Sequence, residues 1–239
     1  MAEICNIKIT DKSRADLFVP YPDLQVLIPM NAECLVKSNS DALLKDFINS
    51  KRTTIDGQIP LWLFKIKNPS EKIEKLSGSD IVYDFCEYAS LNNLKVFFLG
   101  GKESSNCKAI RNLREKYPSL DIDGYSPPYE PYPFSMNNNS RIKDRLSEFK
   151  PDIVFIGFGF GKQEYWVKDN QEFLKDKGVK WTVCCGGTFE FISGEIKRAP
   201  VMIQKIGLEG FWRLLMEPKL FRVKRLITSF KIFKYAYKK

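Results

Sequence analysis

Glycines at alternate positions follow a buried-looking apolar run in the second half of the sequence. Residues 152–156 lead into Gly157, Gly159 and Gly161, and residues 162–164, Lys-Gln-Glu, then begin a helical segment. Glycine lets a ligand come close to the backbone, and the N–H groups at the start of the next helix attract an anion. The pattern is typical of a phosphate- or nucleotide-binding loop, although a tight strand-to-helix turn without a ligand would also produce it.

The absence of histidine limits the chemistry that this chain can perform. None of the 239 residues is histidine, which excludes Ser-His-Asp and Cys-His catalysis and His-ligated zinc. Carboxylates, lysine, tyrosine and backbone groups are left as catalysts. Asp56, followed by Gly57, is one candidate, although an aspartate before glycine is by itself ordinary turn or helix-cap chemistry.

Alternating strand and helix patterns indicate how these residues are positioned. Strands are expected at 24–28, 96–99, 120–124, 152–156 and 181–185, with helices between most of them. Pro29 is expected to end the first strand, one helix is expected from Ala32 to Ile48 after Asn31, and another over about residues 162–177. Continuous rather than alternating apolar runs predict an α/β fold with a parallel sheet that helices cover on both faces. Three of these strands end in glycine, so the sequence predicts a glycine-lined crevice at one sheet edge. The glycines concerned are Gly100, Gly101, Gly157, Gly159, Gly161, Gly186 and Gly187.

The glycine patterns do not match two common nucleotide fingerprints. The segment after Leu99 lacks the G-x-G-x-x-G spacing, position 162 is lysine where a third glycine would be needed, and no Walker A loop is present. Asp121 and Asp123 could hold a divalent cation beneath a nucleotide-sugar diphosphate, or they could simply occupy a strand end before Gly124.

The C-terminal segment is strongly basic and amphipathic. Residues 197–239 contain 12 lysines and arginines against two glutamates, so this tail accounts for the whole net charge of +9. Apolar and aromatic residues recur in it at spacings of three or four, from Ile203 to Leu215 and from Leu220 to Tyr237. The pattern favours basic helices on an anionic membrane surface, with a core-packed helix or a subunit interface as alternatives. No binding motif accompanies the charge, so nucleic acid is not expected as a partner.

Further features bear on organisation and compartment. Residues 1–196 are expected to form the core and residues 197–239 a helical appendage, with residues 1–23 loosely docked. Six cysteines without a C-x-x-C pair or a secretory signal predict reduced core thiols in a cytosolic protein. No apolar run approaches the 18 residues of a spanning helix.

One run of the sequence resembles a known family. Residues 185–200, CGGTFEFISGEIKRAP, resemble the GG-x-FD-x-x-(A/S)G-x-x-KRAP segment of the bacterial WecG/TagA/CpsF glycosyltransferases. Six further segments resemble family motifs in the same order, and the likeness covers about residues 24–230. They lie at residues 31–33, 56–57, 77–80, 98–101, 157–164 and 207–218.

The resemblance implies a fold, a reaction and a compartment. It implies a Rossmann-like core and inverting transfer of a sugar, often N-acetylmannosamine or its uronic acid, from a UDP donor without an essential metal or other cofactor. The acceptor would be a polyprenyl-diphosphate-linked sugar on the cytosolic face of the membrane, for polysaccharide synthesis at the cell surface. The protein would then be cytoplasmic and peripheral on the inner face of the membrane. Its oligomeric state is left open.

The resemblance also assigns roles to residues. Asp56 matches the general base, which would take the proton of the acceptor hydroxyl. It places Asn31 beside that base and Gln163 at the donor site. The crevice expected at the sheet edge adds further donor-binding residues, so the expected set is Asn31, Gly100, Gly101, Gly159, Gln163, Gly186, Gly187 and Glu190. The acceptor-binding residues would be Arg198, Arg213, Arg222 and Arg225, and Arg198 could also meet the charge of the leaving UDP. Two of these residues have an alternative without a ligand. Gln163 could be an exposed residue of the first helical turn, and Glu190 could cap nearby backbone groups.

Departures from the family pattern concern the donor sugar. Pro29, Lys75, Gly161 and Glu190 stand where Thr, Arg, Pro and Asp are usual, and lysine cannot form the bidentate hydrogen bonds of arginine.

A non-catalytic, membrane-associated nucleotide-binding scaffold is one alternative function. A metal-dependent UDP-sugar transferase that uses Asp121 and Asp123 is another.

Overall fold

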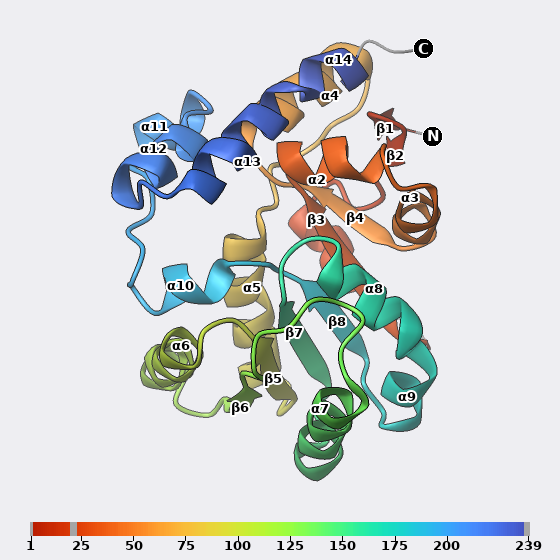
Figure 1. Ribbon diagram of the computed structural model, residues 1–239, viewed down its shortest axis with the longest axis vertical. Coiled ribbons are helices and arrows are strands. Elements are labelled where there is room, and N and C mark those ends of the chain that lie inside the picture. Colours follow the sequence, from red (N-terminus) through yellow and green to blue (C-terminus); the bar gives the residue numbers. More distant parts are fainter. Residues whose placement is uncertain (1, 20–22, 237–239) are drawn as a thin grey trace. The chain divides into compact units, whose positions relative to one another are not determined.

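The computed structural model describes residues 2–19 and 23–236, and it divides into two compact units (Figure 1). The first unit comprises residues 1–20, 28–77 and 197–239, and the second comprises residues 21–27 and 78–196. The predicted division into a core over residues 1–196 and an appendage over residues 197–239 stays a prediction.

A six-stranded sheet has the order β4-β3-β8-β7-β5-β6. The strands are β3 (Gln25–Met30), β4 (Arg52–Ile55), β5 (Lys95–Gly100), β6 (Asp121–Tyr125), β7 (Ile153–Gly157) and β8 (Trp181–Cys184). The β3–β8, β8–β7, β7–β5 and β5–β6 pairs are all parallel. The predicted α/β fold with a Rossmann-like parallel sheet is therefore confirmed.

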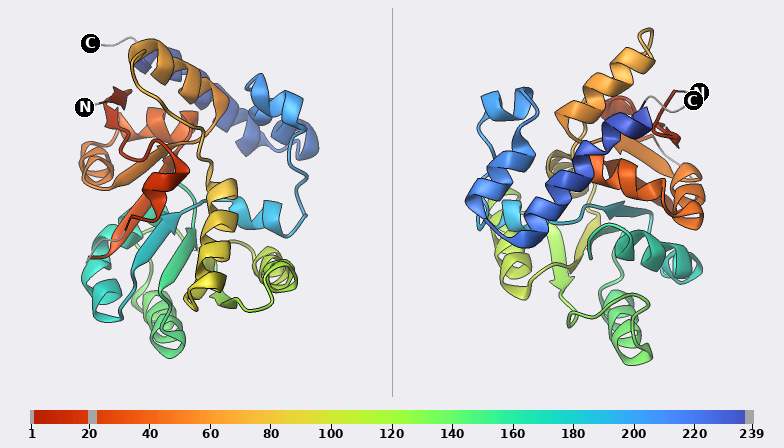
Figure 2. Two further views of the ribbon diagram at one scale, coloured as in Figure 1. Left: turned by 180° about the vertical axis from the view of Figure 1, so that it is seen from behind. Right: turned by 45° about the horizontal axis from the view of Figure 1, so that its top comes forward.

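The second unit contains most of this sheet and its covering helices, α5 (Gly78–Leu91), α6 (Glu103–Lys116), α7 (Met136–Phe149), α8 (Lys162–Asp169), α9 (Gln171–Asp176) and α10 (Thr188–Ile192). Figures 1 and 2 show α7 and α8 on one face of the sheet and α5 on the other. Residues 96–99 of β5 are completely buried, so side chains on both faces of that strand are covered. This burial explains the continuous apolar runs in the sequence.

The first unit combines the start of the chain with its C-terminal helices. Its other elements are β1 (Glu3–Ile4), β2 (Ile7–Lys8), α1 (Arg14–Leu17), α2 (Ala32–Ser38), α3 (Ala42–Asn49), α4 (Gln58–Lys67), α11 (Val201–Lys205), α12 (Glu209–Met216), α13 (Leu220–Phe230) and α14 (Ile232–Ala236). Helices α13 and α14 pack against α2, and α13 also contacts α12 (Figures 1 and 2). The predicted C-terminal helices are therefore present in the described residues.

Several predicted boundaries are wrong. β3 does not stop at Pro29 but continues to Met30, because its ladder with β8 ends at Leu27 and requires no N–H group from Pro29. One predicted helix after Asn31 is two, since Asp41 caps a new helix by accepting a hydrogen bond from the Leu44 amide. The helix expected over residues 162–177 breaks at Asn170, and α10 is not predicted.

The start of the chain is packed rather than loosely docked. Ile4 and Ile7 are fully buried, and Asp11 is only 2% exposed. The guanidinium group of Arg52, at the start of β4, forms an ion pair with Asp11. The apolar residues Ile4, Cys5, Ile7 and Ile9, all buried, were the signal for this docking. Residues 20–22, including the prolines that suggested a loose segment, lie outside the described residues.

Replacing Arg52 with methionine should destabilise the protein by roughly 3–5 kcal/mol, because the buried Asp11 carboxylate would lose its cation. Denaturant unfolding monitored by circular dichroism would measure the change. Arg145→Met, which removes an exposed pair with Asp123, is the control and should cost less than about 1 kcal/mol. Equal losses for the two variants would contradict this view of the N-terminal segment.

Candidate active site

A pocket in the first unit contains five of the residues that the sequence singled out. Its walls come from the start of α2, the β4–α4 turn, the α11–α12 connection, and α12 and α13. The lining residues are Asn31, Ala32, Glu33, Asp56, Gly57, Gln58, Ile59, Pro60, Gly207, Glu209, Gly210, Arg213, Arg222, Arg225, Leu226 and Ser229. Asn31, Asp56 and three of the four predicted acceptor-binding arginines therefore share one cavity.

Asp56 lies directly after β4, at a turn that fixes its backbone. Its N–H group donates to the Met30 carbonyl oxygen at 3.1 Å, which ties it to the end of β3. Gly57 follows with φ +94°, a conformation that favours glycine, and α4 starts at the next residue. The Asp-Gly pair is therefore a turn as well as the position of a half-buried carboxylate in the pocket.

Asn31 caps α2. Its Oδ1 atom accepts a hydrogen bond from the Cys34 amide at 3.1 Å. This contact fixes the side chain at the helix start, where Asn31 lines the pocket. Asn31 and Asp56 follow the adjacent strands β3 and β4, which explains why residues 25 positions apart line the same cavity.

Arg222 and Arg225 are each held by a carboxylate. The Nε atom of Arg225 lies 2.5 Å from Oε2 of Glu33, which is buried at the start of α2. Arg222 donates to Oε2 of Glu217 through both Nε (3.1 Å) and Nη2 (2.6 Å). Lysine and arginine contacts lower the pKa of Glu217, so this carboxylate is stabilised in its charged form. Both guanidinium groups therefore have fixed orientations.

Arg213 interacts electrostatically with the other charges of the pocket. Burial lowers its pKa, the carboxylates of Asp56 and Glu209 raise it, and the positive charges of Arg225 and Arg222 lower it. Arginine stays charged in proteins, so this balance describes a desolvated cation close to both an aspartate and two further cations. Such a site favours an additional anion.

Arg198 is not in the lining of this pocket. Its Nη2 atom lies 3.4 Å from Oγ of Ser77, within the same unit. The structure therefore separates Arg198 from the other three predicted acceptor-binding arginines.

The predicted glycine edge lies in the second unit. Gly100 stands opposite Gly157 in the β5–β7 ladder, and the Gly101 amide donates to the Gly157 carbonyl oxygen at 3.1 Å. Ile156 pairs with Cys184 of β8, so Gly186 follows two residues after the end of the same ladder. The strand ends that were expected at one edge are therefore adjacent.

Aromatic side chains explain some of these glycines without a ligand. A Cβ atom on Gly101 or Gly157 would lie within 2.9 Å of the Phe189 ring, and one on Gly100 would lie 2.8 Å from Phe158. By contrast, no described atom lies within 4 Å of the Cβ position of Gly159 or Gly186, and both have positive φ. The same holds for Gly161, so Gly159, Gly161 and Gly186 are the glycines of this edge that face open space.

Gln163 is buried, not exposed, and it links two turns of the edge. Its Oε1 atom accepts from the Gly186 amide at 3.2 Å, and its Nε2 atom donates to Oε1 of Glu164 at 2.8 Å. The other carboxylate oxygen of Glu164 accepts from the Gly161 amide at 2.6 Å. The four residues form a chain of hydrogen bonds that fixes the turn after β7 relative to the turn after β8.

Glu190 folds back over the start of its own helix. Its Oε2 atom lies 2.7 Å from the position that a Cβ atom on Gly187 would take. The carboxylate therefore lies close to the first turn of α10, as the simpler interpretation of Glu190 requires.

Asp121 and Asp123 do not lie with the glycines. Asp121 begins β6 opposite Lys95, at the edge of the sheet away from Gly100, and its carboxylate lies 3.3 Å from the Lys95 ammonium. Asp123 lies 3.3 Å from Arg145. These placements remove the geometric basis for a cation that they would hold beneath a diphosphate at the glycine edge.

Comparisons with known proteins agree with the motifs. The family model described as "Glycosyl transferase WecG/TagA/CpsF family" matches residues 13–239. The chain belongs to this glycosyltransferase family. One relative, from Bacillus subtilis (strain 168), is an N-acetylglucosaminyldiphosphoundecaprenol N-acetyl-beta-D-mannosaminyltransferase. It is 25% identical over 211 residues, which cover 88% of this chain and 77% of the relative.

The carboxylates of this glycosyltransferase's pocket were not among the predicted site residues. Glu33 and Glu209 line the cavity, and Glu217 holds Arg222. Glu33 and Glu217 stand inside motifs that resemble the family, in residues 31–33 and 207–218, so position in a motif was the available signal. Their roles became visible only with the arginines beside them.

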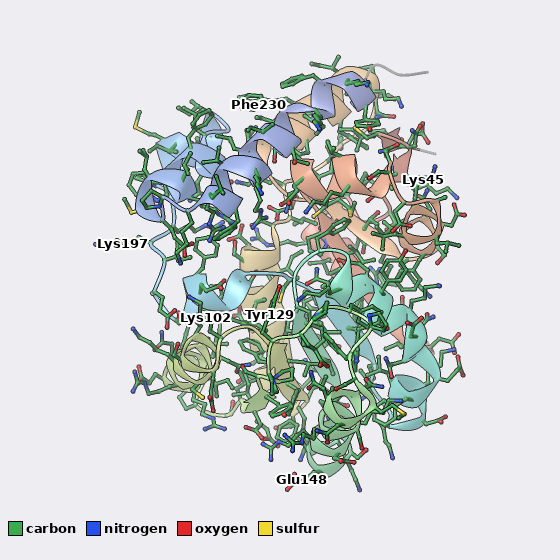
Figure 3. All side chains as sticks on the ribbon, in the orientation of Figure 1. Lys45, Lys102, Tyr129, Glu148, Lys197 and Phe230 are labelled. Atoms are coloured by element: carbon green, nitrogen blue, oxygen red, sulfur yellow. The ribbon has the colours of Figure 1, made fainter. Side chains whose placement is uncertain are left out.

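The C-terminal helices of this glycosyltransferase expose many apolar side chains. Of the 20 large hydrophobic residues that are exposed in the described chain, 13 lie between Val201 and Phe233. Phe230 on α13, labelled in Figure 3, is 49% exposed. Within the described residues, no helix combines the length and apolar character that crossing a membrane requires. Tyr237, the last residue of the predicted stripe, lies outside the described residues.

The cysteines are less uniform than predicted. Cys107 is exposed on α6, whereas Cys5, Cys34, Cys86 and Cys184 are buried and Cys185 is intermediate. The prediction that all six are core thiols is therefore wrong for Cys107.

Glu164 should make the stability of the protein depend on pH. Burial raises the pKa of Glu164 to about 7, despite hydrogen bonds from Gln163 and Gly161 that lower it. The folded state then binds more protons than the unfolded state between about pH 4.5 and 7. The free energy of unfolding therefore falls as pH rises through this window.

In Glu164→Gln this dependence should disappear. The free energy of unfolding of the variant minus that of the parent should rise by roughly 1.4 kcal/mol per pH unit across the window, to a total of about 3 kcal/mol. Urea unfolding at several pH values measures the difference. Glu172→Gln, at an exposed position, is the control and should follow the parent. A constant difference for Glu164→Gln would contradict the raised pKa.

Proposed function

We propose that this glycosyltransferase transfers a sugar of the N-acetylmannosamine type from a UDP donor to a polyprenyl-diphosphate-linked sugar, with inversion and without a metal. The observation that carries the proposal is the pocket that combines the Asp56 carboxylate with Arg213, Arg222 and Arg225. The name of the Bacillus subtilis relative supports both the acceptor class and the sugar type. The product would be an intermediate in polysaccharide synthesis at the cell surface.

In the proposed step, Asp56 acts as the general base. Its carboxylate accepts the proton of an acceptor hydroxyl while the hydroxyl oxygen bonds to the anomeric carbon of the donor. The bond from that carbon to the β-phosphate oxygen breaks, and UDP leaves with the bonding electrons. The products are the extended acceptor, UDP and one proton on Asp56, so the step is balanced.

The three arginines suit the diphosphate of the acceptor. Guanidinium groups bind phosphate oxygens through paired N–H donors, and their fixed orientations reduce the entropy lost on binding. With the lining carboxylates Glu33, Asp56 and Glu209, the pocket is balanced at three positive and three negative charges. A diphosphate would therefore be bound by the directed N–H donors of Arg213, Arg222 and Arg225 rather than by a net positive charge of the pocket.

The donor is assigned to the glycine edge of the second unit. Gly159 and Gly186 have open space at the backbone, and α8 begins directly after Gly161. Backbone N–H groups there would meet the charge that develops on the leaving UDP. Gln163 would act by holding the Gly186 turn rather than through an exposed side chain.

Of the alternative functions, the non-catalytic scaffold is disfavoured by the family, which consists of glycosyltransferases. The metal-dependent alternative is disfavoured by the ion pairs of Asp121 and Asp123 and by the position of Asp121 at the start of β6.

Asp56→Asn should lower the transfer rate by about 10²- to 10⁴-fold, because the amide cannot accept the hydroxyl proton. The assay would supply UDP-N-acetylmannosamine and polyprenyl-diphosphate-linked N-acetylglucosamine, and calorimetry would verify that the variant still binds UDP. Asp144→Asn, on the exposed side of α7, is the control and should keep the parent rate. Transfer by Asp56→Asn at the parent rate would rule out Asp56 as the base.

The exposed apolar side chains of the C-terminal helices support peripheral association with the inner face of the cell membrane. The same segment is basic: Lys219, Lys224, Lys231 and Lys234 lie in or beside α13 and α14, a composition typical of helices on anionic bilayers. The face could instead join subunits, which would also cover apolar surface.

The double substitution Ile227→Asp and Phe233→Asp should weaken binding to phosphatidylglycerol-containing vesicles at least about tenfold, since it adds repulsion and removes apolar contact. Vesicle sedimentation would measure the effect, and Leu91→Asp, an exposed apolar position on α5, is the control. Unchanged vesicle binding together with loss of self-association would show instead that this face is a subunit interface.

A further inference from the structure

Glu33 is a buried carboxylate that makes two ion pairs at the wall of the pocket. It is only 5% exposed, near the start of α2. Its Oε2 atom lies 2.5 Å from Nε of Arg225, and its Oε1 atom lies 2.6 Å from Nζ of Lys37. Each carboxylate oxygen therefore has its own cation.

We infer that Glu33 is a positioning residue, which orients the guanidinium group of Arg225 toward an anionic acceptor in the pocket. The inference rests on the proposed function, in which Arg225 binds the acceptor diphosphate. It goes beyond that function because it gives a role to a carboxylate that acts through Arg225.

The atoms in contact support this role. Glu33 accepts from Nε, the nitrogen nearest the side-chain stem, so the two terminal nitrogens of Arg225 keep four N–H donors for another partner. The guanidinium group is planar, so fixing Nε also fixes the plane in which those donors point. Arg225 itself lines the pocket. A diphosphate could bind to it without displacing Glu33.

The charge of Glu33 also matters for the neighbouring arginines. The positive charges of Arg225 and Arg222 lower the pKa of Arg213, as expected for cations that line one pocket. A carboxylate beside Arg225 offsets part of the repulsion between such charges. Glu33 therefore keeps the cations together before any substrate arrives.

A simpler role is that Glu33 only fastens α13 to α2, which do pack together. If that were the only role, removing Glu33 would weaken the packing of the whole helix. It would then disturb Arg222, which also lies on α13, as much as Arg225. The two roles therefore differ in whether the effect of Glu33 passes through Arg225 alone.

The first test measures KM separately for the lipid-linked acceptor and for the UDP-sugar. Glu33→Gln should raise the KM for polyprenyl-diphosphate-linked N-acetylglucosamine about tenfold, the effect of losing one charged hydrogen bond, and leave the donor KM unchanged. Lys37→Met removes the other partner of Glu33 and keeps the Arg225 pair, so it should keep both values of the parent. Equal changes in both KM values, or no change, would overturn the inference.

The second test places Glu33→Gln in two other backgrounds. In Arg225→Lys protein the added substitution should change the acceptor KM by less than about twofold, because residues that act through one another are not additive. In Arg222→Lys protein it should keep its full effect of about tenfold. A full effect in both backgrounds would show that Glu33 only fastens the helix.

Outcomes for this inference and for the proposed function are distinguishable. If the parent protein transfers no sugar to the lipid-linked acceptor, the proposed function fails. If the parent is active and Glu33→Gln follows the control, only the inference fails. Should Glu33→Gln not fold, Glu33→Asp replaces it, because it keeps the charge but withdraws it from Nε. The same separation of the two KM values is then expected.

Discussion

Helices α12 and α13 bring three arginines to one pocket of the first unit, and carboxylates must compensate their positive charges. Guanidinium groups this close repel one another when water is scarce, so each requires a carboxylate nearby. Glu33 and Glu217 hold Arg225 and Arg222, and Asp56 and Glu209 act on Arg213. The same arrangement places the proposed base among cations.

The glycine edge of the second unit follows a different constraint. Phe158 and Phe189 lie so close to the backbone that side chains at Gly100, Gly101 and Gly157 would clash with them. These glycines therefore serve packing, and the stacked rings of Phe98 and Phe189, 4.4 Å apart, extend that packing into the core. The open turns are left to Gly159, Gly161 and Gly186. The side chains of Gln163 and Glu164 accept hydrogen bonds from the amides of Gly186 and Gly161 and keep those turns in place.

Much of the fold could be predicted because buried parallel strands leave continuous apolar runs, as in residues 96–99 and 153–156. Element ends were harder to predict. Pro29 looked like a stop but lies beyond the β3–β8 ladder, and Asn170 interrupts a helix whose apolar pattern continues. For the site, motif resemblance identified Asp56 and the arginines. It did not indicate that Gln163 is buried or that Glu33 and Glu217 hold arginines, because those facts depend on contacts between residues as far as 192 positions apart.

The central claim is that the acceptor diphosphate binds in the pocket of Asp56 and the three arginines. Hydrogen–deuterium exchange of the parent protein tests it directly, with and without a short-chain polyprenyl diphosphate that carries N-acetylglucosamine. The account predicts slower exchange in residues 31–33, 56–60 and 207–229 together, because these segments form the lining. Protection confined to residues 100–101, 157–163 and 186–187, with none in the pocket segments, would contradict it.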